Sequence, residues 1–190
     1  MQNEIVITGF GGQGVLLAGT LIAQAAIEQG LHTTWVPSYG AEMRGGTANS
    51  TVVVSSDEIG SPLAFNPDAL IALNEPSLNK FISRVTDNAI VIANSSIIPQ
   101  NTEYKVKPYF IPVTDIADKE IKNLRTANTV AVGTLIRVFE LHHFNVQRNT
   151  DKKGLTLKSV LSACEKIFAS KPQLIEINKK AIQAGYDFIK

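Results

Sequence analysis

The residues of this 190-residue chain that are best suited to chemistry form a glycine-rich turn near its start. The turn has the sequence GFGGQG, which is a G-x-G-x-x-G spacing with one extra glycine. Glycines let the backbone turn sharply and approach a ligand closely, and the first free N–H groups of a following helix attract anions. The turn therefore predicts a site for an anionic ligand or partner group, and the alternative is a tight turn whose glycines serve packing alone. The candidate binding residues are Gly9, Gly11, Gly12, Gln13 and Gly14.

A second candidate element is the loop YGAEMRGGTANS over residues 39–50. It places Glu42 and Arg44 two positions apart, between glycines. A guanidinium group suits bidentate binding of a phosphate or carboxylate, so Arg44 is a candidate anion ligand. Because the loop follows a second predicted strand, we expect it near the glycine turn at the carboxyl edge of a sheet. The alternative is a Glu42–Arg44 pair that only braces the loop or a subunit contact.

Other kinds of site find little support in the sequence. An NAD site has an acid near the end of the second strand, whereas the first acid after that strand here is Glu42, beyond Pro37 and Gly40. No Lys-Ser/Thr pair follows the glycines, which excludes a Walker A loop. His142 and His143 lack the HExxH order and suit the end of a helix. We therefore predict no catalytic residue and no metal ligand in this chain.

Composition narrows the classes of protein further. The chain has 18 Lys and Arg against 17 Asp and Glu, a formal net charge of +1, which removes the general electrostatic case for nucleic acid or an anionic membrane surface. Its single cysteine, Cys164, cannot form an internal disulfide or hold an iron–sulfur cluster alone, and we expect it buried in an amphipathic helix. The start of the chain does not resemble a secretory signal, and the apolar run Val15 to Ile27 is too short for a membrane span. These features favour a cytoplasmic protein.

The elements that must position the two candidate segments follow a recognisable order. A β-branched strand over residues 4–8 precedes the glycine turn, and a helix runs from there to Gln29, with Gly30 as a left-handed C-terminal cap. A strand over residues 32–36 completes a βαβ unit of parallel strands. Further strands are predicted over residues 50–55, 69–73, 89–93 and 109–113.

Helices dominate the second half. A helix is predicted over residues 76–85, and Thr114 could cap the helix DIADKEIKN. Helices follow over residues 128–144, 156–169 and 172–189, with a polar, flexible loop over 145–154. We therefore expect an α/β fold in one domain over residues 1–190: a single doubly wound, mostly parallel sheet with a helical C-terminal layer.

Both candidate segments also carry a family resemblance. The chain closely resembles the gamma subunit of 2-oxoacid:ferredoxin (acceptor) oxidoreductases, and EMRGGTAN followed by IGSP is most like the 2-oxoglutarate type. The pyruvate and indolepyruvate types have related loops, so the resemblance leaves the 2-oxoacid open. The matching segments cover Ile7 to Ala26, Tyr39 to Pro62, Asp68 to Phe81 and Leu174 to Phe188.

The resemblance implies a role inside a larger enzyme. Such an enzyme decarboxylates a 2-oxoacid on thiamine diphosphate, passes electrons through iron–sulfur clusters to ferredoxin, and releases an acyl-CoA. Alpha, beta and delta-type subunits hold the thiamine diphosphate, its Mg²⁺ and the clusters. The gamma subunit is structural, is not active alone, and is expected to share in binding coenzyme A.

Anion chemistry together with this family role assigns coenzyme A to the five turn residues and Arg44. Two other classes stay open at this point. One is a free-standing oxidoreductase that binds NAD(P) or a flavin, and the other is an interaction module that belongs to no enzyme.

Overall fold

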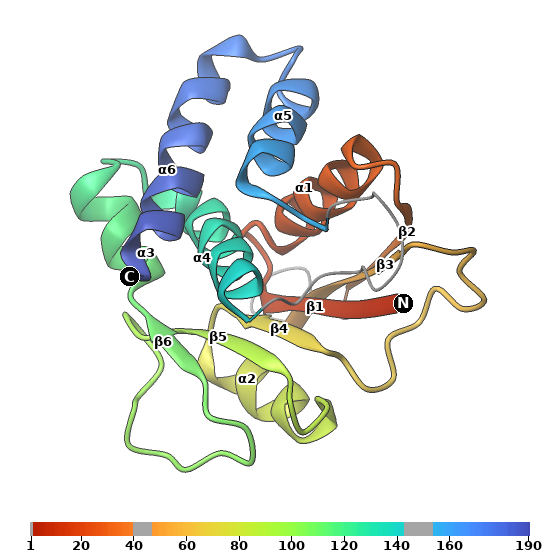
Figure 1. Cartoon of the computed structure of the whole chain (residues 1–190). Helices are drawn as coiled ribbons and strands as arrows, with labels where there is room; N and C mark the ends of the chain where they lie inside the picture. The colour runs from red at the N-terminus through yellow and green to blue at the C-terminus, as the bar shows by residue number, and fades with distance from the viewer. Residues whose placement is uncertain (1, 40–46, 143–153) are drawn as a thin grey trace.

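A mixed sheet of six strands forms the centre of the molecule (Figure 1). The computed structural model describes residues 2–39, 47–142 and 154–190. The sheet order is β2-β3-β1-β4-β5-β6. The strands are β1 (Gln2–Phe10), β2 (His32–Tyr39), β3 (Thr47–Ser55), β4 (Ala69–Ala72), β5 (Ile90–Asn94) and β6 (Tyr109–Ile111). All six predicted strands are therefore present, with ends displaced by a few residues.

Within the described sheet, β3 alone runs against the other strands. It pairs antiparallel with both β1 and β2, whereas the pairs β1–β4, β4–β5 and β5–β6 are all parallel. The predicted βαβ unit therefore has its two strands in the same direction but not side by side, because β3 lies between them. The physical reason is the short connection from β2 to β3, which permits a hairpin but not a parallel crossover. The prediction of a single, mostly parallel sheet is confirmed.

Helices cover both faces of this sheet, as doubly wound folds require (Figure 1). Helix α2 (Glu75–Phe81), continued by the 3₁₀ turn η1 (Ile82–Arg84), lies on one face. The opposite face carries α1 (Val15–Glu28), α4 (Ala127–Leu141), α5 (Leu157–Ile167) and α6 (Ile175–Phe188). The predicted helical C-terminal layer is thus confirmed. None of the described helices combines the length and the apolar character of a membrane-crossing segment.

Alternating side chains of the strands supply two cores. Ile5 and Ile7 of β1 are fully buried against the layer that contains α1 and α4, whereas Val6 packs with Leu78 of α2. This alternation is the period-two pattern of a strand that is buried on both faces.

One prediction about the segment after β6 is wrong. Thr114 does not cap a helix from outside; it lies within the short helix α3 (Val113–Asp115), and Pro112 holds the N-cap position. The Thr114 hydroxyl instead accepts a hydrogen bond from Asn94 at the end of β5, over 2.8 Å. The chain continues as a π-helical turn, η2 (Ile116–Glu120), and then as the 3₁₀ turn η3 (Leu124–Thr126), which leads into α4.

At the helix ends, the prediction for Gly30 is confirmed. Gly30 has φ of +68°, the left-handed conformation expected after α1. Thr156 caps α5 in a reciprocal pair of hydrogen bonds with Ser159. The predicted flexible loop over residues 145–154 lies almost entirely outside the described residues.

Helices α4 and α6 cross at two glycines. A Cβ atom added at Gly133 would lie 1.9 Å from the Ile182 carbonyl oxygen, and one added at Gly185 would lie 1.9 Å from that of Val130. Because backbone meets backbone at both points, the C-terminal layer depends on glycine there. The short 3₁₀ turn η4 (Pro172–Leu174) brings the chain from α5 into α6.

Candidate functional site: the glycine turn at the carboxyl edge of the sheet

The glycine turn joins β1 to α1 at the carboxyl ends of the parallel strands. Helix α1 leaves β1 on one face of the sheet, and α2 leaves the neighbouring strand β4 on the other (Figure 1). Open α/β sheets bind ligands at such a point, because the two chain connections diverge there and leave a crevice. The predicted anion site therefore lies where this fold most often places a ligand.

Two glycines of the turn have backbone conformations that other residues rarely adopt. Gly12 has φ of +94°, and Gly14, the N-cap residue of α1, has φ of +73°. The Gln13 N–H donates to the Phe10 carbonyl oxygen over 3.1 Å and closes the turn. Glycine adopts these left-handed angles without the steric cost that a Cβ atom brings.

The side chain of Gln13 braces the turn from inside. Its Oε1 accepts hydrogen bonds from Phe10 N at 2.7 Å and from Asn74 Nδ2 at 2.9 Å. Its Nε2 donates to the Leu73 carbonyl oxygen over 3.3 Å. Asn74 is itself fixed, because its Oδ1 accepts from Ser77 N as the N-cap of α2. Gln13 thus connects the start of α1 with the end of β4.

Gly9 and Gly14 are surrounded by other atoms. A Cβ atom added at Gly9 would lie 2.8 Å from Gln13 Oε1 and 3.2 Å from Leu73 Cβ. One added at Gly14 would lie 2.5 Å from Nδ2 of Asn128, which donates to the Gly14 carbonyl oxygen over 3.0 Å. Packing alone therefore gives a sufficient reason for glycine at these two positions.

Gly11 and Gly12, by contrast, are exposed. No heavy atom lies within 4 Å of a Cβ atom added at Gly12. Beside them is a hollow of about 240 Å³, which Phe10, Gly14, Ala48 and the first residues of α1 also line. The first turn of α1 holds no acidic residue, and its free N–H groups carry partial positive charge. An anion in this hollow would meet backbone groups and apolar side chains, and its binding there stays a prediction.

The predicted ligand Arg44 and its neighbour Glu42 lie outside the described residues. Both ends of their loop are described. Tyr39 at the end of β2 is opposite Ala48 of β3, and Ala48 is opposite Gly9 of β1. The loop therefore begins one strand away from the glycine turn and ends beside it, while the binding role of Arg44 stays a prediction.

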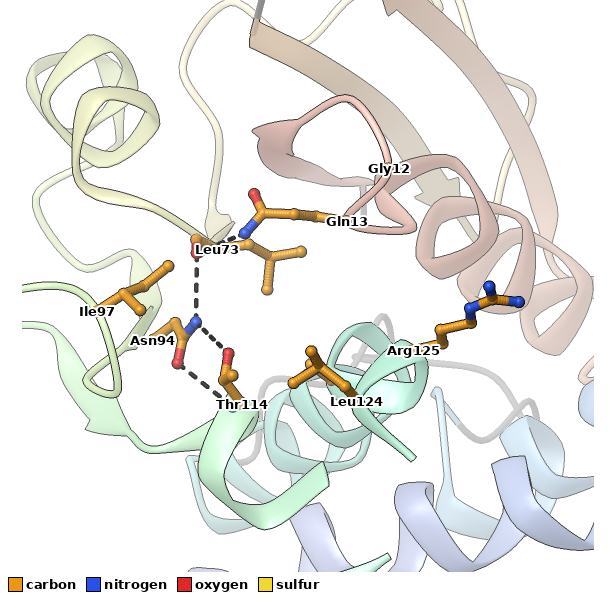
Figure 2. Close-up of a pocket in the computed structure, with 9 residues that line it drawn as sticks. Gly12, Gln13, Leu73, Asn94, Ile97, Thr114, Leu124 and Arg125 are labelled. Carbon is orange, nitrogen blue, oxygen red and sulfur yellow. Dashed lines mark hydrogen bonds between the residues drawn. The ribbon is translucent and has the colours of Figure 1, made fainter. Parts of the chain in front are cut away.

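A larger hollow, of about 360 Å³, lies on the other side of Gly12, beyond the ends of β4 and β5 (Figure 2). Leu73, Asn94, Thr114 and Arg125 are among its lining residues. Our sequence analysis did not single out any of these as a site residue. The sequence has an asparagine directly after each of the predicted strands 69–73 and 89–93, at positions 74 and 94, and this signal could have indicated this edge.

The remaining chemically suggestive residues have structural surroundings. His142 follows the last turn of α4 and is hydrogen-bonded to the Tyr109 hydroxyl, while His143 lies outside the described residues. Cys164 is buried as predicted, and burial raises the pKa of its thiol to about 11. Among the described residues, no group of three or more His, Cys, Asp or Glu side chains could hold a metal ion.

Known proteins resemble this chain in sequence and in fold. Residues 4–188 match the family model described as pyruvate ferredoxin/flavodoxin oxidoreductase. The ketoisovalerate oxidoreductase subunit VorA of Methanothermobacter marburgensis is 36% identical over the whole chain. The chain spans only 37% of the length of that relative. The 2-oxoglutarate synthase subunit KorC of Methanocaldococcus jannaschii is 32% identical, over the whole chain and 95% of the relative.

Two solved structures share the fold. The gamma subunit of a keto/oxoacid ferredoxin oxidoreductase from Geobacter sulfurreducens aligns with a TM-score of 0.77 and 24% identity, over 97% of this chain and 96% of that one. The 2-oxoglutarate:ferredoxin oxidoreductase of Magnetococcus marinus, solved with 2-oxoglutarate, coenzyme A and succinyl-CoA bound, aligns with a TM-score of 0.80 and 22% identity, over the whole chain and 32% of that one. With nearly its whole length inside the family model, the chain belongs to the pyruvate ferredoxin/flavodoxin oxidoreductase family, and its homologues are subunits of 2-oxoacid oxidoreductases.

Proposed function

We propose that this chain is the gamma subunit of a multi-subunit 2-oxoacid:ferredoxin oxidoreductase, with residues 1–190 acting as one domain in the cytoplasm. The complex would convert a 2-oxoacid and coenzyme A to an acyl-CoA and carbon dioxide, with two electrons passed to ferredoxin. We propose 2-oxoglutarate as the substrate, because the KorC relative matches this chain over nearly its full length. Ketoisovalerate is the second candidate, because VorA has the higher identity.

Partner subunits of the alpha, beta and delta types would hold the thiamine diphosphate, its Mg²⁺ and the iron–sulfur clusters. One cysteine in the whole chain is too few for a cluster of its own. The contribution of this chain is to complete the site and to share in binding coenzyme A.

The open half of the glycine turn is the observation that supports a coenzyme A site. Exposed Gly11 and Gly12 let a diphosphate approach the backbone, and the start of α1 offers free N–H groups with no acidic residue in its first turn. Gly9, Gln13 and Gly14 would hold this backbone in place through the contacts described above. Arg44 would add a guanidinium from a loop that ends beside the turn.

Reconstitution tests the proposed function. The full set of subunits should reduce a viologen dye in the presence of a 2-oxoacid, coenzyme A and thiamine diphosphate, and this chain alone should not. Comparing 2-oxoglutarate, 2-oxoisovalerate and pyruvate identifies the substrate. Turnover by this chain alone, or binding of NAD(P) or a flavin in a thermal-shift titration, would contradict the proposal.

Arg44 variants test the coenzyme A site within the same complex. If Arg44 binds a phosphate bidentately, Arg44→Ala should weaken coenzyme A binding by about 1.5–3 kcal/mol, and Arg44→Lys should restore only part of it. If Arg44 only pairs with Glu42 in solvent, the change should be about 0–1 kcal/mol and confined to stability. Coenzyme A titrations and the melting temperature of the isolated chain separate the two cases.

A further inference from the structure

The hollow beyond β4 and β5 adjoins the proposed coenzyme A site and shares the turn residue Gln13 with it. Gly12 is the only described residue that lines both hollows. The hollow beyond β4 and β5 has a volume of about 360 Å³, which lies within the range of small-molecule sites. Figure 2 shows its polar part, where Asn94 and Thr114 face the end of β4 at Leu73.

Hydrogen bonds inside the protein occupy two acceptors of this hollow. The Leu73 carbonyl oxygen accepts from both Gln13 Nε2 and Asn94 Nδ2, each at 3.3 Å. Asn94 Oδ1 accepts from Ser96 N at 3.3 Å and from Thr114 N at 3.5 Å. Both groups can accept two hydrogen bonds, so neither has capacity left for a ligand.

Two side chains of the hollow have donor capacity that is not used within the described part of the chain. The Thr114 hydroxyl accepts from Asn94 Nδ2 at 2.8 Å and donates to no acceptor in the described part of the chain. Gln13 Nε2 has two hydrogens, and it donates one of them, to Leu73. A ligand that fits these two groups must offer acceptor atoms.

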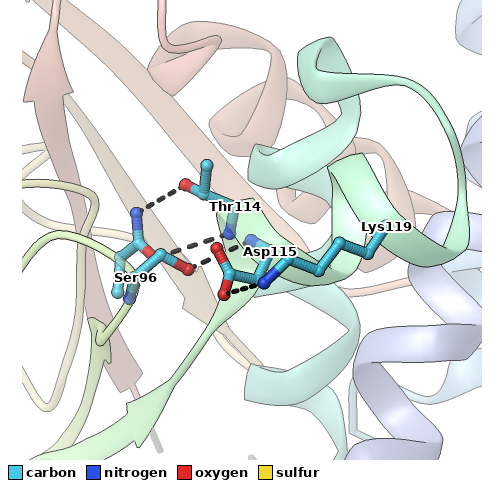
Figure 3. Close-up of polar contacts among 5 residues, drawn as sticks. Ser96, Thr114, Asp115 and Lys119 are labelled. Carbon is cyan, nitrogen blue, oxygen red and sulfur yellow. Dashed lines mark hydrogen bonds and ion pairs between the residues drawn. The ribbon is translucent and has the colours of Figure 1, made fainter.

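The local charge also favours an anion. Of the described residues that line the hollow, none is acidic. The guanidinium of Arg125 makes no ion pair with the described residues, and Figure 2 shows it at the rim, directed away from Thr114. The nearby carboxylate of Asp115 is held by Lys119 Nζ at 2.8 Å, as Figure 3 shows. Arg125 therefore attracts an anion through its field, and Thr114 is placed to contact it.

Apolar side chains complete the hollow. Ile97 and Leu124 are 50% and 57% exposed, and Figure 2 shows them on either side of Thr114. Exposed aliphatic side chains around a group of hydrogen-bond donors suit a ligand with an apolar body and one polar end.

We propose that this hollow is a binding site for a small carboxylate with an aliphatic tail. The carboxylate would accept hydrogen bonds from the Thr114 hydroxyl and the free N–H of Gln13, and the tail would lie between Ile97 and Leu124. The site consists of described residues of this chain alone, so it does not depend on the proposed role in a complex.

A titration of the full-length chain tests this assignment. Isovalerate is the probe. Three compounds serve as comparisons: 3-methylbutan-1-ol has the same tail without the charge, acetate has the charge without the tail, and the third is inorganic phosphate. In ¹H–¹⁵N correlation spectra, isovalerate should produce saturable shifts in the amides of residues 94–97, 113–115 and 124–127. It should bind roughly ten- to a hundredfold more tightly than the alcohol.

Variants then assign the contacts. Thr114→Val should weaken isovalerate binding by roughly tenfold or more, because it removes a hydrogen bond to a charged group. Thr114→Ser keeps the hydroxyl and should bind nearly as well as the original chain. Leu124→Ser should reduce the preference for isovalerate over acetate. Arg125→Gln should weaken binding a few-fold, and less so at high salt, whereas Lys158→Gln on α5 makes the same charge change elsewhere and should have no effect.

The spectra of each variant also report whether it is folded. Binding of the alcohol as tightly as the acid, shifts confined to other parts of the chain, or unchanged binding in both Thr114→Val and Leu124→Ser would overturn the proposal. Preferential binding of phosphate would show that the donors form a simple anion site, and would overturn the role given to the apolar side chains.

Discussion

The glycine turn has a packed half and an open half, made largely from the same residue type. Gly9 and Gly14 each have a neighbouring atom closer than 3 Å to the position of a Cβ atom, whereas Gly12 has none within 4 Å. The packed half fixes the backbone through Gln13 and Asn128, and the open half presents that backbone to whatever binds. A match to a glycine motif therefore gives the location of a site without telling which glycines support it and which face a ligand.

The largest effect is expected in the packed half, for Gly14→Ala. Alanine at φ of +73° is strained, and its methyl group would meet the Asn128 amide. We expect a loss of about 2–4 kcal/mol in the free energy of unfolding, measured by urea denaturation of the isolated chain. Gly12→Ala is the matched control, since it adds strain without a clash and should cost only about 1–2 kcal/mol. Equal losses in the two variants would remove the distinction between the halves.

Replacing Gln13 by leucine should have the next largest effect. The change removes the acceptor for Phe10 N and Asn74 Nδ2 and the donor to Leu73. We expect a loss of about 1–3 kcal/mol, because partly buried donors are left without partners. Hydrogen exchange should show earlier opening of the turn and the start of α2, with the α4–α6 layer unchanged. A uniform loss of protection over the whole chain would show that Gln13 does not act locally.

The open half is tested by Gly12→Asp. A carboxylate at the start of α1 repels the anion proposed there, in addition to the strain that Gly12→Ala also carries. In the reconstituted complex we expect the KM for coenzyme A to be roughly tenfold higher with Gly12→Asp than with Gly12→Ala. The measurement is the KM for coenzyme A in the dye assay. Identical values for the two variants would assign the turn to packing alone.

Sequence patterns predicted the strands and most helices because each has its own periodicity and end signals. The apolar runs of β4 and β5 and the left-handed Gly30 are local features of this kind. The position of β3 was not predictable in this way, because strand order depends on contacts between segments distant in the sequence. The same limit explains Thr114, whose hydroxyl is engaged by Asn94, 20 residues earlier.

The candidate site was likewise predictable only where its residues are close together in the sequence. The turn was predictable because a strand, its glycines and a helix adjoin in the sequence. The bracing role of Gln13 was not, because its partners Leu73 and Asn74 lie about 60 residues away. The hollow beyond Asn94 was missed for the same reason, since five segments contribute to it.

The smallest effect is expected in a comparison of the two ends of β1. At each end, a backbone N–H donates to a side-chain oxygen. Phe10 N donates to the neutral amide of Gln13, and Glu4 N donates to Asp68 Oδ2 over 2.9 Å. Burial raises the pKa of the Asp68 carboxyl despite this hydrogen bond. The folded chain then binds a proton more readily than the unfolded chain, so the Asp68 contribution to stability improves as the pH falls toward the raised pKa and is least favourable at neutral pH.

Asp68→Asn should therefore stabilise the chain slightly at neutral pH, because the amide oxygen can still accept from Glu4 N and no charge is buried. The gain should shrink as the pH falls through the raised pKa of Asp68, because the aspartate is then neutral in the folded chain, and it should change no further below the usual carboxyl range. Urea denaturation of both chains across this range measures it, and Asp87→Asn, at an exposed carboxylate paired with Lys105, is the control with the opposite sign. If Asp68→Asn instead destabilised the chain equally at every pH, the buried charge of Asp68 would not be what lowers its stability at neutral pH.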